Sequence, residues 1–449
     1  MLGYIGGIPN ANQNTNYRKN LSKKITYELE NKEFGSCSKD SRSGAFTRER
    51  KLTLKNLIVM IICFKSSIQR ELDRFFKDLS RSDFNIREVT KSAFTQARAK
   101  LKFEAFKRLN EITVKAFYDE AEYYVWHNMR TFAVDGTRLM LPNHPTVKEE
   151  FGEHSFGPKS DSKRSLAVAS MLYDVFNHIT VDAEIAPYAS SENDLLIRHL
   201  PKLNKGDLLL LDRGYPCFWL LFLLKAKGIE FCVRLKENWW IKVKEFSESS
   251  DMERIVSFTL PKKDHKKLFE HPKVVNQEIY CRLIKVELPT GEIEILCTSL
   301  LDQEEYKHEE FDELYHYRWG EEEAYKLLKS RVELENFSGK TATAVKQDFH
   351  AKVFLLSLCA AYAHPIEDKV REEFKADENR KHSQKINRTN AISMTQNILL
   401  SVFIRKQYEK ALKAFDEIVF NTREIIRLGR SNPRNHIQKK PYSMNYKRL

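Results

Sequence analysis

Apolar residues change their spacing along the chain, and these changes predict where helices give way to strands. Between residues 51 and 125 they recur at three- and four-residue intervals, as at Leu72, Phe75, Phe76 and Leu79, which is the pattern of amphipathic helices. Beyond Trp126, short runs rich in Val, Leu and Ile predict strands instead. The predicted strands are 130–134, 166–173, 179–185, 207–211 and 230–235, and the predicted helices between them are 191–200 and 218–227.

This order of elements predicts the fold class. Strands come first and then alternate with helices, which is typical of an α/β fold with a mixed sheet and helices packed on it. After residue 235 the alternation stops, and a turn at Pro289-Thr290-Gly291 joins two further strand-like segments. The strands predicted there are 254–260, 278–288 and 292–299, and helices are predicted to resume at 309–331, 344–362 and 392–428.

The patterns divide the chain into five regions. They are a loosely ordered polar N-terminus at 1–50 with one helix near 21–31, an all-helical basic domain at 51–125, a split α/β core at 126–235 and 302–365, a β-rich insertion at 236–301, and a C-terminal helical segment with a basic tail at 366–449.

The charge of the chain points to a polyanionic partner. Its 449 residues include 75 Lys and Arg against 62 Asp and Glu, a formal charge of +13. Residues 1–125 hold 24 basic and 15 acidic side chains, and residues 430–449 hold six basic and no acidic ones. Basic ends around a nearly neutral middle suit a protein that grips a nucleic-acid backbone, although solvated tails would give the same balance.

Composition also bears on the compartment. A hydrophobic share of 42% is enough for a core and excludes wholesale disorder. None of the seven Cys lies in a C-x-x-C pair, so neither a disulfide framework nor a cysteine zinc site is predicted. The longest apolar run, Leu57 to Phe64, is far shorter than the about 20 residues of a membrane-spanning helix. We expect a cytoplasmic protein that does not bind membranes.

Two carboxylates follow predicted strands of the core. Asp135 comes directly after the apolar run of FAVDGT, and Asp212 after that of LLLLDRGY. Open sheets build their sites at the carboxyl ends of strands, and two carboxylates there can share divalent cations. Each residue has an ordinary structural interpretation as well: Asp135 as part of an Asp-Gly turn, and Asp212 as a loop residue or a helix cap.

A third carboxylate lies on the predicted helix at 309–331. Tyr315, Arg318, Glu322 and Lys329 stand at offsets of 0, 3, 7 and 14. At about 100° per residue these positions share one stripe of the helix, and such a mixture of charges is unlike a packing face. The alternative is a solvated charged face, since Glu321 and Glu323 flank Glu322.

These pieces carry a family resemblance. The segments AVDGTRLMLP, LLLLDRGYP and YHYRWGEEEAYKLLKSRVELENFSGKT resemble the three signature blocks of DDE transposases of the insertion-sequence-four family, whose helix has the spacing Tyr-x2-Arg-x3-Glu-x6-Lys. The likeness runs from about residue 92 to 362. It implies a ribonuclease-H-like core in which Asp135, Asp212 and Glu322 bind two Mg²⁺ or Mn²⁺ ions. It also implies that Tyr315, Arg318 and Lys329 contact DNA phosphates near the cut.

The resemblance further implies a function. The expected protein is a cut-and-paste transposase that binds the terminal inverted repeats of its element, cleaves the strands and joins them to target DNA. It would act as a homodimer on double-stranded DNA, in the bacterial cytoplasm at the nucleoid, without a nucleotide cofactor. Two alternatives stay open from the residues: a ribonuclease-H-like nuclease without strand transfer, and a non-catalytic DNA-binding regulator.

The segment at 92–108 is the candidate for reading DNA sequence. Its basic side chains lie close together in the chain beside Gln96: Arg98, Lys100, Lys102, Lys107 and Arg108. Helical basic domains commonly read DNA, but charge alone gives affinity without sequence preference. The alternative is that the segment packs against the core and only the tips of Lys and Arg reach phosphate.

Other motifs give weaker indications of function. His144 and His154 have no partner His at helical spacing, so a zinc site is not predicted. No G-x-x-x-x-G-K-[ST] sequence occurs, which argues against an ATP-driven motor. Trp239 and Trp240 are either packing residues or a platform for a flipped base.

Overall fold

The computed structural model describes residues 2–5, 11–40, 46, 51–65, 67–155, 163–288 and 291–426. Two predicted features, the basic tail at 430–449 and the Pro289-Thr290 turn, lie outside these residues. The chain forms two compact units. The sheet unit comprises Met1–Ile8, Glu122–Arg138 and Val168–Tyr325, and the helical unit comprises Pro9–Ala121, Leu139–Ala167 and Lys326–Leu449.

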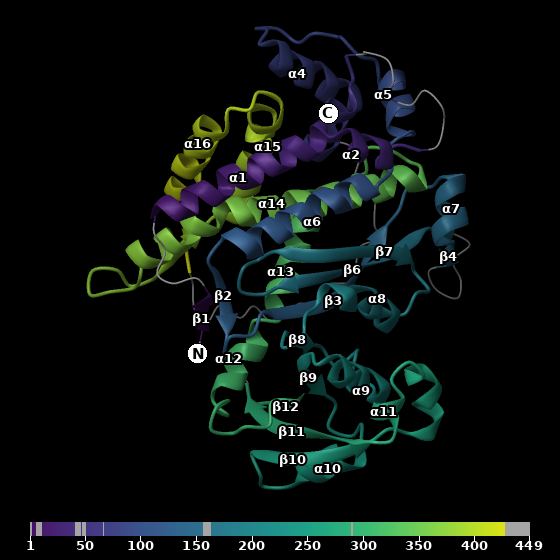
Figure 1. Ribbon diagram of the computed structural model, residues 1–449, viewed down its shortest axis with the longest axis vertical. Helices are drawn as coiled ribbons and strands as arrows, with labels where there is room; N and C mark the ends of the chain where they lie inside the picture. The colour runs from purple at the N-terminus through teal and green to yellow at the C-terminus, as the bar shows by residue number, and fades with distance from the viewer. Residues whose placement is uncertain are drawn as a thin grey trace. The chain divides into compact units, whose positions relative to one another are not determined.

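An eight-stranded sheet in the order β10-β11-β12-β9-β8-β3-β6-β7 organises the sheet unit (Figure 1). Its strands are β3 (Thr131–Met140), β6 (Leu166–Asp174), β7 (Thr180–Pro187), β8 (Leu208–Leu211), β9 (Glu230–Leu235), β10 (Glu253–Thr259), β11 (Glu278–Glu287) and β12 (Ile293–Thr298). The central strands β3, β8 and β9 run parallel, whereas β9, β12, β11 and β10 pair antiparallel. The sheet is therefore mixed, as the sequence predicts.

Burial explains the sequence of the central strands. All four residues of β8 are Leu and all are buried, because a parallel strand between two neighbours is covered on both faces. The ion pair of Arg130 with Asp207, at 2.5 Å, joins the residues that precede β3 and β8. The β3–β8 register is therefore held at its beginning by charge and along its length by apolar packing.

Helices complete the sheet unit. They are α8 (Glu192–His199), α9 (Phe218–Lys227), α10 (Ile241–Glu248), α11 (Pro272–Val275), α12 (Glu310–His316) and α13 (Trp319–Lys326), with short 3-10 turns η1 (Leu200–Lys202) and η2 (Lys262–Leu268) and the strand pair β1 (Leu2–Ile5) and β2 (Tyr123–Trp126). The long helix predicted at 309–331 is interrupted, because Tyr317 and Arg318 form a turn between α12 and α13.

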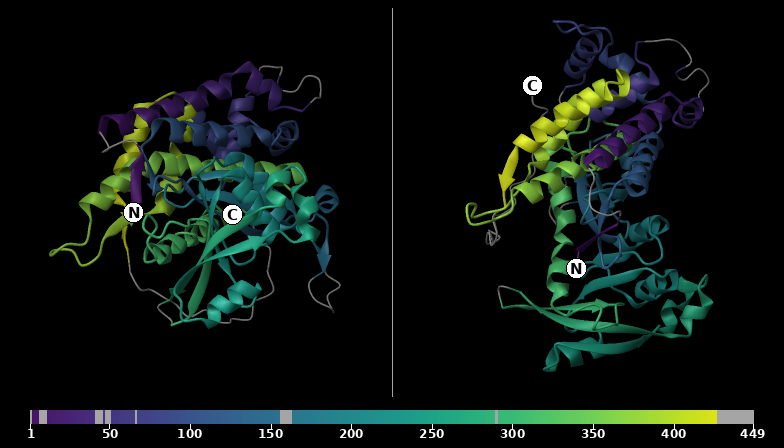
Figure 2. Two further views of the ribbon diagram at one scale, coloured as in Figure 1. Left: turned by 60° about the horizontal axis from the view of Figure 1, so that its bottom comes forward. Right: turned by 60° about the vertical axis from the view of Figure 1, so that its left-hand side comes forward.

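The β-rich insertion is not a separate layer. Strand β12 pairs with β9 of the core, from Ile295 opposite Leu235 to Thr298 opposite Cys232, so β10–β12 widen the same sheet (Figure 2). The strands are where the sequence predicts them, but their place in the core sheet is set by long-range pairing that a local pattern does not record.

The helical unit is built around the long helix α14 (Ala342–Glu373), which is buried along most of its length. Helices α1, α3, α6, α15 and α16 pack against it. The elements of this unit are α1 (Ala11–Glu30), α2 (Lys32–Cys37), α3 (Leu54–Cys63), α4 (Ile68–Ser80), α5 (Lys91–Arg98), α6 (Glu104–Glu120), α7 (Pro145–Phe151), η3 (Leu327–Arg331), α15 (Arg388–Leu399), η4 (Leu400–Ile404) and α16 (Tyr408–Asn421), with the strand pairs β4 (His154–Ser155) with β5 (Lys163–Arg164) and β13 (Gln384–Ile386) with β14 (Arg423–Ile425).

Two expectations about the N-terminal part are corrected by this arrangement. The single helix predicted near 21–31 is part of the longer α1, which starts at residue 11 and is followed by α2, so these residues are not loosely ordered; Leu21 and Ile25 are fully buried and anchor α1. The helices at 51–125 do not form a compact unit of their own, since they belong to the same unit as α14. Within the described ranges of the chain, no helix combines the length and the apolar character needed to cross a membrane.

Candidate active site

Asp135 and Asp212 lie where the pairing of two parallel strands, β3 and β8, stops. The last paired residues of β3 and β8 are Val134 and Leu211, which lie opposite each other. Asp135 and Asp212 are the next residues of the two strands, and neighbouring strands lie about 4.8 Å apart. The two carboxylates therefore start from adjacent backbone positions at one edge of the sheet. The sequence suggested that Asp135 follows the end of its strand. In the structure β3 is longer, and Asp135 lies inside it.

Helix α13 binds the backbone of Asp135 through two side chains. The N–H of Asp135 donates to Glu321 Oε1 at 2.8 Å, and Tyr325 Oη donates to the carbonyl of Asp135 at 2.8 Å. The Asp135 carboxylate itself accepts the Gly136 N–H at 2.7 Å. The segment of α13 that carries Glu322 is thereby attached to the strand that carries Asp135.

Glu321, Glu322 and Glu323 have different environments. Glu321 is fully buried, Glu322 is partly exposed and Glu323 is exposed. Burial and the nearby Asp135 raise the pKa of Glu321 well above its ordinary value. Of the three, Glu322 combines access to solvent with a contact to Arg318, whose Nη2 lies 3.5 Å from Glu322 Oε1.

Arg318 is a buried cation beside these carboxylates. Only 3% of its surface is exposed. Burial alone would lower its pKa, but Tyr315, Asp212, Glu322 and Asp135 outweigh that effect and raise the pKa of the guanidinium. Arg318 therefore stays charged and offsets part of the negative charge of the site.

Burial is also the main influence on Asp135. It raises the pKa of Asp135 to about 6 from an ordinary 3.8, against the lowering effects of the Gly136 N–H and of Arg318. Glu192 and Glu322 add to the increase. The ionised form of Asp135 is therefore disfavoured mainly by burial and to a lesser extent by the neighbouring carboxylates.

Glu192, at the beginning of α8, is a residue that the sequence did not single out. Its Oε1 lies 2.8 Å from where a Cβ at Gly136 would stand, and its Oε2 lies 3.6 Å from the corresponding position at Gly214. Gly136 thus leaves the room that the Glu192 carboxylate fills, whereas the distance at Gly214 is that of an ordinary van der Waals contact. The Gly in DGT and in DRGY was the available signal, but a glycine does not say which side chain approaches it.

Tyr315 does not present its hydroxyl to solvent. The ring is buried, and Oη donates to the carbonyl of Leu211 at 3.3 Å, at the end of β8. Burial raises the pKa of this hydroxyl above its ordinary value. In the described structure Tyr315 fixes α12 to the strand that carries Asp212.

Several buried polar atoms of this region have no hydrogen-bond partner within the described part of the chain. They are Asp212 Oδ1, Tyr215 Oη, Arg318 Nε and Glu321 Oε2. Buried polar groups normally find partners, so such a group of atoms indicates a site arranged for something other than its own stability. The residues that carry these atoms lie near the point where the pairing of β3 with β8 stops, next to Asp135 and Asp212.

The donors of the site fit a hard divalent cation. Among the residues that the structure describes, no three His, Cys, Asp or Glu side chains are arranged to hold a metal ion. Mg²⁺ does not require three, because it keeps several waters and is bound through one or two carboxylates and substrate phosphates. Asp135, Asp212 and Glu322 offer only oxygen, and Asp212 Oδ1 is buried without a partner in the described chain. By donor type these residues suit Mg²⁺ or Mn²⁺.

Lys329 belongs to the other unit. It lies in the π-helical segment η3, and burial lowers its pKa while Glu335 raises it. The structure brings Tyr315, Arg318 and Glu322 together in the sheet unit, and Lys329 follows them along the chain into the helical unit.

The basic residues predicted to read DNA are not equivalent. Arg98 is 4% exposed, and its guanidinium pairs with Asp348 at 2.9 Å and donates to Gln347, Ser338 and the carbonyl of Ala344. Arg98 is thus committed to the interior of the helical unit. The remaining four are at least partly exposed, with Arg108 paired to Glu28 at 3.1 Å: Lys100, Lys102, Lys107 and Arg108.

Two of the minor candidates, His144 and Trp240, have structural roles. His144 caps α7, where its Nδ1 accepts the N–H of Thr146 at 3.3 Å. Trp240 stacks on Phe218 with ring centroids 4.2 Å apart, which makes it a packing residue. Trp239 is exposed, with the ammonium of Lys236 over its ring.

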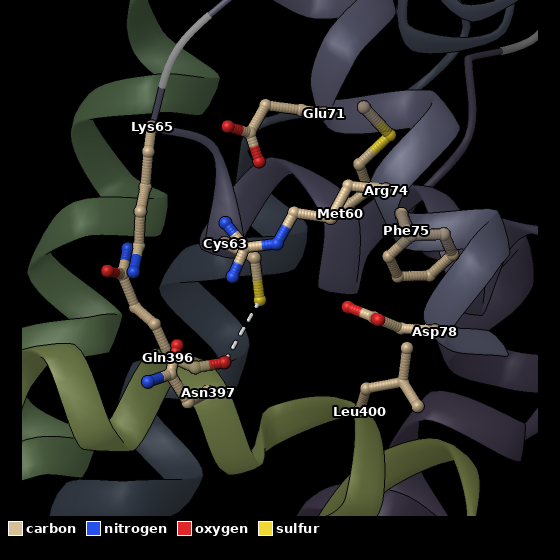
Figure 3. Close-up of a pocket in the computed structure, with 10 residues that line it drawn as sticks. All are labelled: Met60, Cys63, Lys65, Glu71, Arg74, Phe75, Asp78, Gln396, Asn397 and Leu400. Atoms are coloured by element: carbon tan, nitrogen blue, oxygen red, sulfur yellow. Dashed lines mark hydrogen bonds between the residues drawn. The ribbon is translucent and has the colours of Figure 1, made fainter. Parts of the chain in front are cut away.

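A separate cavity of about 220 Å³ lies within the helical unit (Figure 3). Residues of α3, α4 and α15 line it, and the Cys63 thiol donates to the carbonyl of Gln396 at 3.6 Å. Burial raises the pKa of Cys63 to about 12. A thiol that stays protonated is not a nucleophile, so this cavity is not a second catalytic centre of that kind.

Comparisons with known proteins agree with the geometry. The family model described as the transposase DDE domain matches residues 126–358. The chain is 23% identical over 305 residues to transposase InsG for insertion sequence element IS4 of Escherichia coli (strain K12), and 28% identical over 143 residues to InsZ of the same strain. These matches cover 65% and 31% of this chain, and they span only 65% of InsG and 47% of InsZ.

A solved structure, the cryo-EM structure of the piggyBac transposase synaptic complex with hairpin DNA, is similar over 98% of this chain and 91% of that chain. The TM-score is 0.44 and the identity is 10%, which is too distant to carry an argument.

Proposed function

This chain belongs to the DDE transposase family of the IS4 type, and from that membership we propose that it is the transposase of an insertion sequence, acting on DNA by cut and paste. It binds the terminal inverted repeats of its element, cleaves the strands at the element ends and joins them to target DNA. The observation that carries the proposal is the β3–β8 register, which supports a shared site for Asp135 and Asp212 beside Glu322 of α13.

In this proposal Asp135, Asp212 and Glu322 hold two Mg²⁺ or Mn²⁺ ions. When bound, these ions supply the positive charge that activates a water or a 3′-hydroxyl and stabilises the leaving oxygen at phosphorus. The residues fit that role because their carboxylates supply only oxygen donors and Arg318 neutralises only part of the charge. The pKa of Asp135 is raised mainly by burial, and Glu192 and Glu322 add to the increase.

The chain's own residues then orient the substrate. Arg318 presents a planar guanidinium, whose geometry suits two oxygens of one phosphate. Its Nε is buried and has no partner in the described part of the chain, so one donor of the guanidinium is not used by the protein itself. Tyr315, held on the Leu211 carbonyl, supports the strand end rather than contacting phosphate itself in this arrangement. Lys329, in η3, is the further phosphate contact that the family resemblance implies.

The proposed partners are double-stranded DNA and a second copy of the chain. Two element ends must be cut together, which favours a homodimer in the DNA complex. The proposed contacts to the DNA backbone are exposed basic residues of the N-terminal region, among them Lys102, between α5 and α6, and Arg108 of α6. Nucleoid association in the cytoplasm would follow from DNA binding.

One reconstituted reaction separates this function from its alternatives. The full chain is mixed with Mg²⁺, a labelled duplex that carries the inverted repeat bracketing its gene, and a supercoiled target plasmid. A transposase yields strands cut at the repeat boundary and labelled strands joined to the plasmid. Cutting without joined product indicates a nuclease without strand transfer. Binding without cutting indicates a regulator, and a duplex with a scrambled repeat is the control.

A further inference from the structure

Both backbone polar groups of Asp135 are bonded to side chains of one helix. Glu321 accepts the N–H and Tyr325 donates to the carbonyl, each at 2.8 Å. The two residues are four positions apart on α13 and therefore lie on the same face of the helix. Helix α13 thus binds both the N–H and the carbonyl of Asp135, one on each side of its α-carbon.

The strand pattern explains why Asp135 needs such partners. Pairing between β3 and β8 ends at Val134 and Leu211, so Asp135 lies just beyond that parallel ladder. Buried backbone N–H and C=O groups require partners, and here side chains of a helix supply what a neighbouring strand would otherwise provide. The hydrogen bonds thereby link the two elements that carry Asp135 and Glu322.

Glu321 is a poor choice for stability alone. It is fully buried in contact with Asp135, and its Oε2 has no partner within the described chain. Placing a carboxyl group in an apolar interior is unfavourable unless it is fully hydrogen-bonded, and an apolar side chain would fill the position without that penalty. What the carboxyl adds is an acceptor at the amide of Asp135.

We propose that Glu321 and Tyr325 are positioning residues that fix Asp135 relative to Glu322 by holding the Asp135 backbone, so that the two carboxylates present one geometry to a bound cation. This rests on the proposed function in one respect, the role of Asp135 and Glu322 in holding the metal. Partners that orient metal ligands commonly change metal affinity or activity about 10- to 100-fold when they are removed.

Four variants of the full chain test the proposal: Glu321→Leu removes the acceptor, Glu321→Gln keeps it, Tyr325→Phe removes the donor to the carbonyl, and Glu323→Leu is the matched control on the exposed face. The first readout is amide hydrogen exchange, in EDTA, of the peptides that contain Asp135. Exchange at Asp135 should accelerate in Glu321→Leu and remain slow in Glu321→Gln and Glu323→Leu. This readout does not depend on activity.

The second readout is DNA cleavage as a function of Mg²⁺ concentration. Glu321→Leu should need about tenfold more Mg²⁺ for half-maximal cleavage, Tyr325→Phe should be affected in the same direction, and Glu321→Gln and Glu323→Leu should resemble the wild type. Melting temperatures of all variants separate this effect from loss of folding. If Glu321→Leu does not fold, the Tyr325→Phe and Glu321→Gln variants still decide the question.

Two results would overturn the proposal. One is unchanged exchange and unchanged Mg²⁺ dependence in Glu321→Leu. The other is equal impairment of Glu321→Gln and Glu321→Leu, which would mean that the negative charge of Glu321 is what the site uses. A wild type that cleaves no DNA would instead contradict the proposed function, and the exchange experiment would still stand as the test of the hydrogen bonds.

Discussion

Single side chains at this site oppose the stability of the fold. Asp135 is the clearest case, because burial raises its pKa to about 6 from 3.8. A raised pKa means that the folded protein binds the proton more tightly than the unfolded chain does. The stability that protonation provides is therefore complete below about pH 4 and is lost as the pH rises through 6.

Replacing Asp135 with Asn removes this loss. In EDTA, we expect Asp135→Asn to melt a few degrees above the wild type at pH 7 and close to the wild type at pH 4, because only the ionised carboxyl is unfavourable. Thermal melts of both proteins between pH 4 and pH 8 measure the difference. A difference that stays constant across this range would show that the effect does not come from ionisation of Asp135.

The sequence predicts which of Glu321, Glu322 and Glu323 is the candidate metal ligand, but not what the other two do. The spacing from Tyr315 and Arg318 predicts Glu322, and the structure makes Glu322 the partly exposed one beside Arg318. The burial of Glu321 and its bond to Asp135 depend on a strand that lies 186 positions away in the chain. A periodic pattern within one helix carries no information about such a partner, nor about Glu192.

At the scale of elements, local patterns predict strands and short helices well. Strand β9 and helix α9 begin and end at the predicted residues. The pattern fails where distant parts of the chain decide the outcome: β10–β12 join the core sheet through β9, and the N-terminal helices pack with α14. The break at Tyr317 and Arg318 was hidden as well, because Arg318 continues the stripe that begins at Tyr315 and neither residue is a Gly or Pro that would mark a helix end.

The network around Arg98 gives a prediction at this scale. Arg98→Ala leaves Asp348 buried without its ion-pair partner, and breaking a buried pair destabilises a protein by about 3–5 kcal/mol. Lys102→Ala changes an exposed side chain and should alter stability by less than about 0.5 kcal/mol. Urea unfolding of both variants in the absence of DNA measures this. An Arg98→Ala protein of wild-type stability with weakened DNA binding would restore Arg98 as a DNA contact.

At the scale of the whole molecule, the net charge of +13 governs how the chain meets DNA. Lys and Arg side chains that contact phosphates release counterions, so the binding constant falls steeply with salt. The interactions that distinguish one sequence from another depend less on salt, because they are made to base edges.

Titrations of the full chain with end DNA and scrambled DNA at two salt concentrations test this division. We expect both affinities to fall with salt, with end DNA bound more tightly at each concentration. The double variant Lys102→Ala/Arg108→Ala should weaken both to a similar extent and reduce the salt slope by about one for each phosphate that the variant no longer neutralises. Equal affinity for both DNAs would mean that the proposed DNA-binding residues contribute electrostatic affinity but no sequence preference.

The central claim is that Asp135, Asp212 and Glu322 form one metal-dependent site for cutting DNA. Its most direct test is cleavage of labelled end DNA in Mg²⁺ by Asp135→Ala, Asp212→Ala and Glu322→Ala, with Glu323→Ala as the neighbouring control and DNA binding measured in EDTA. We predict that the three variants lose cleavage by about a thousandfold or more while still binding DNA, and that Glu323→Ala cleaves like the wild type. Wild-type cleavage by any of the three, or loss of cleavage in Glu323→Ala alone, would contradict the account.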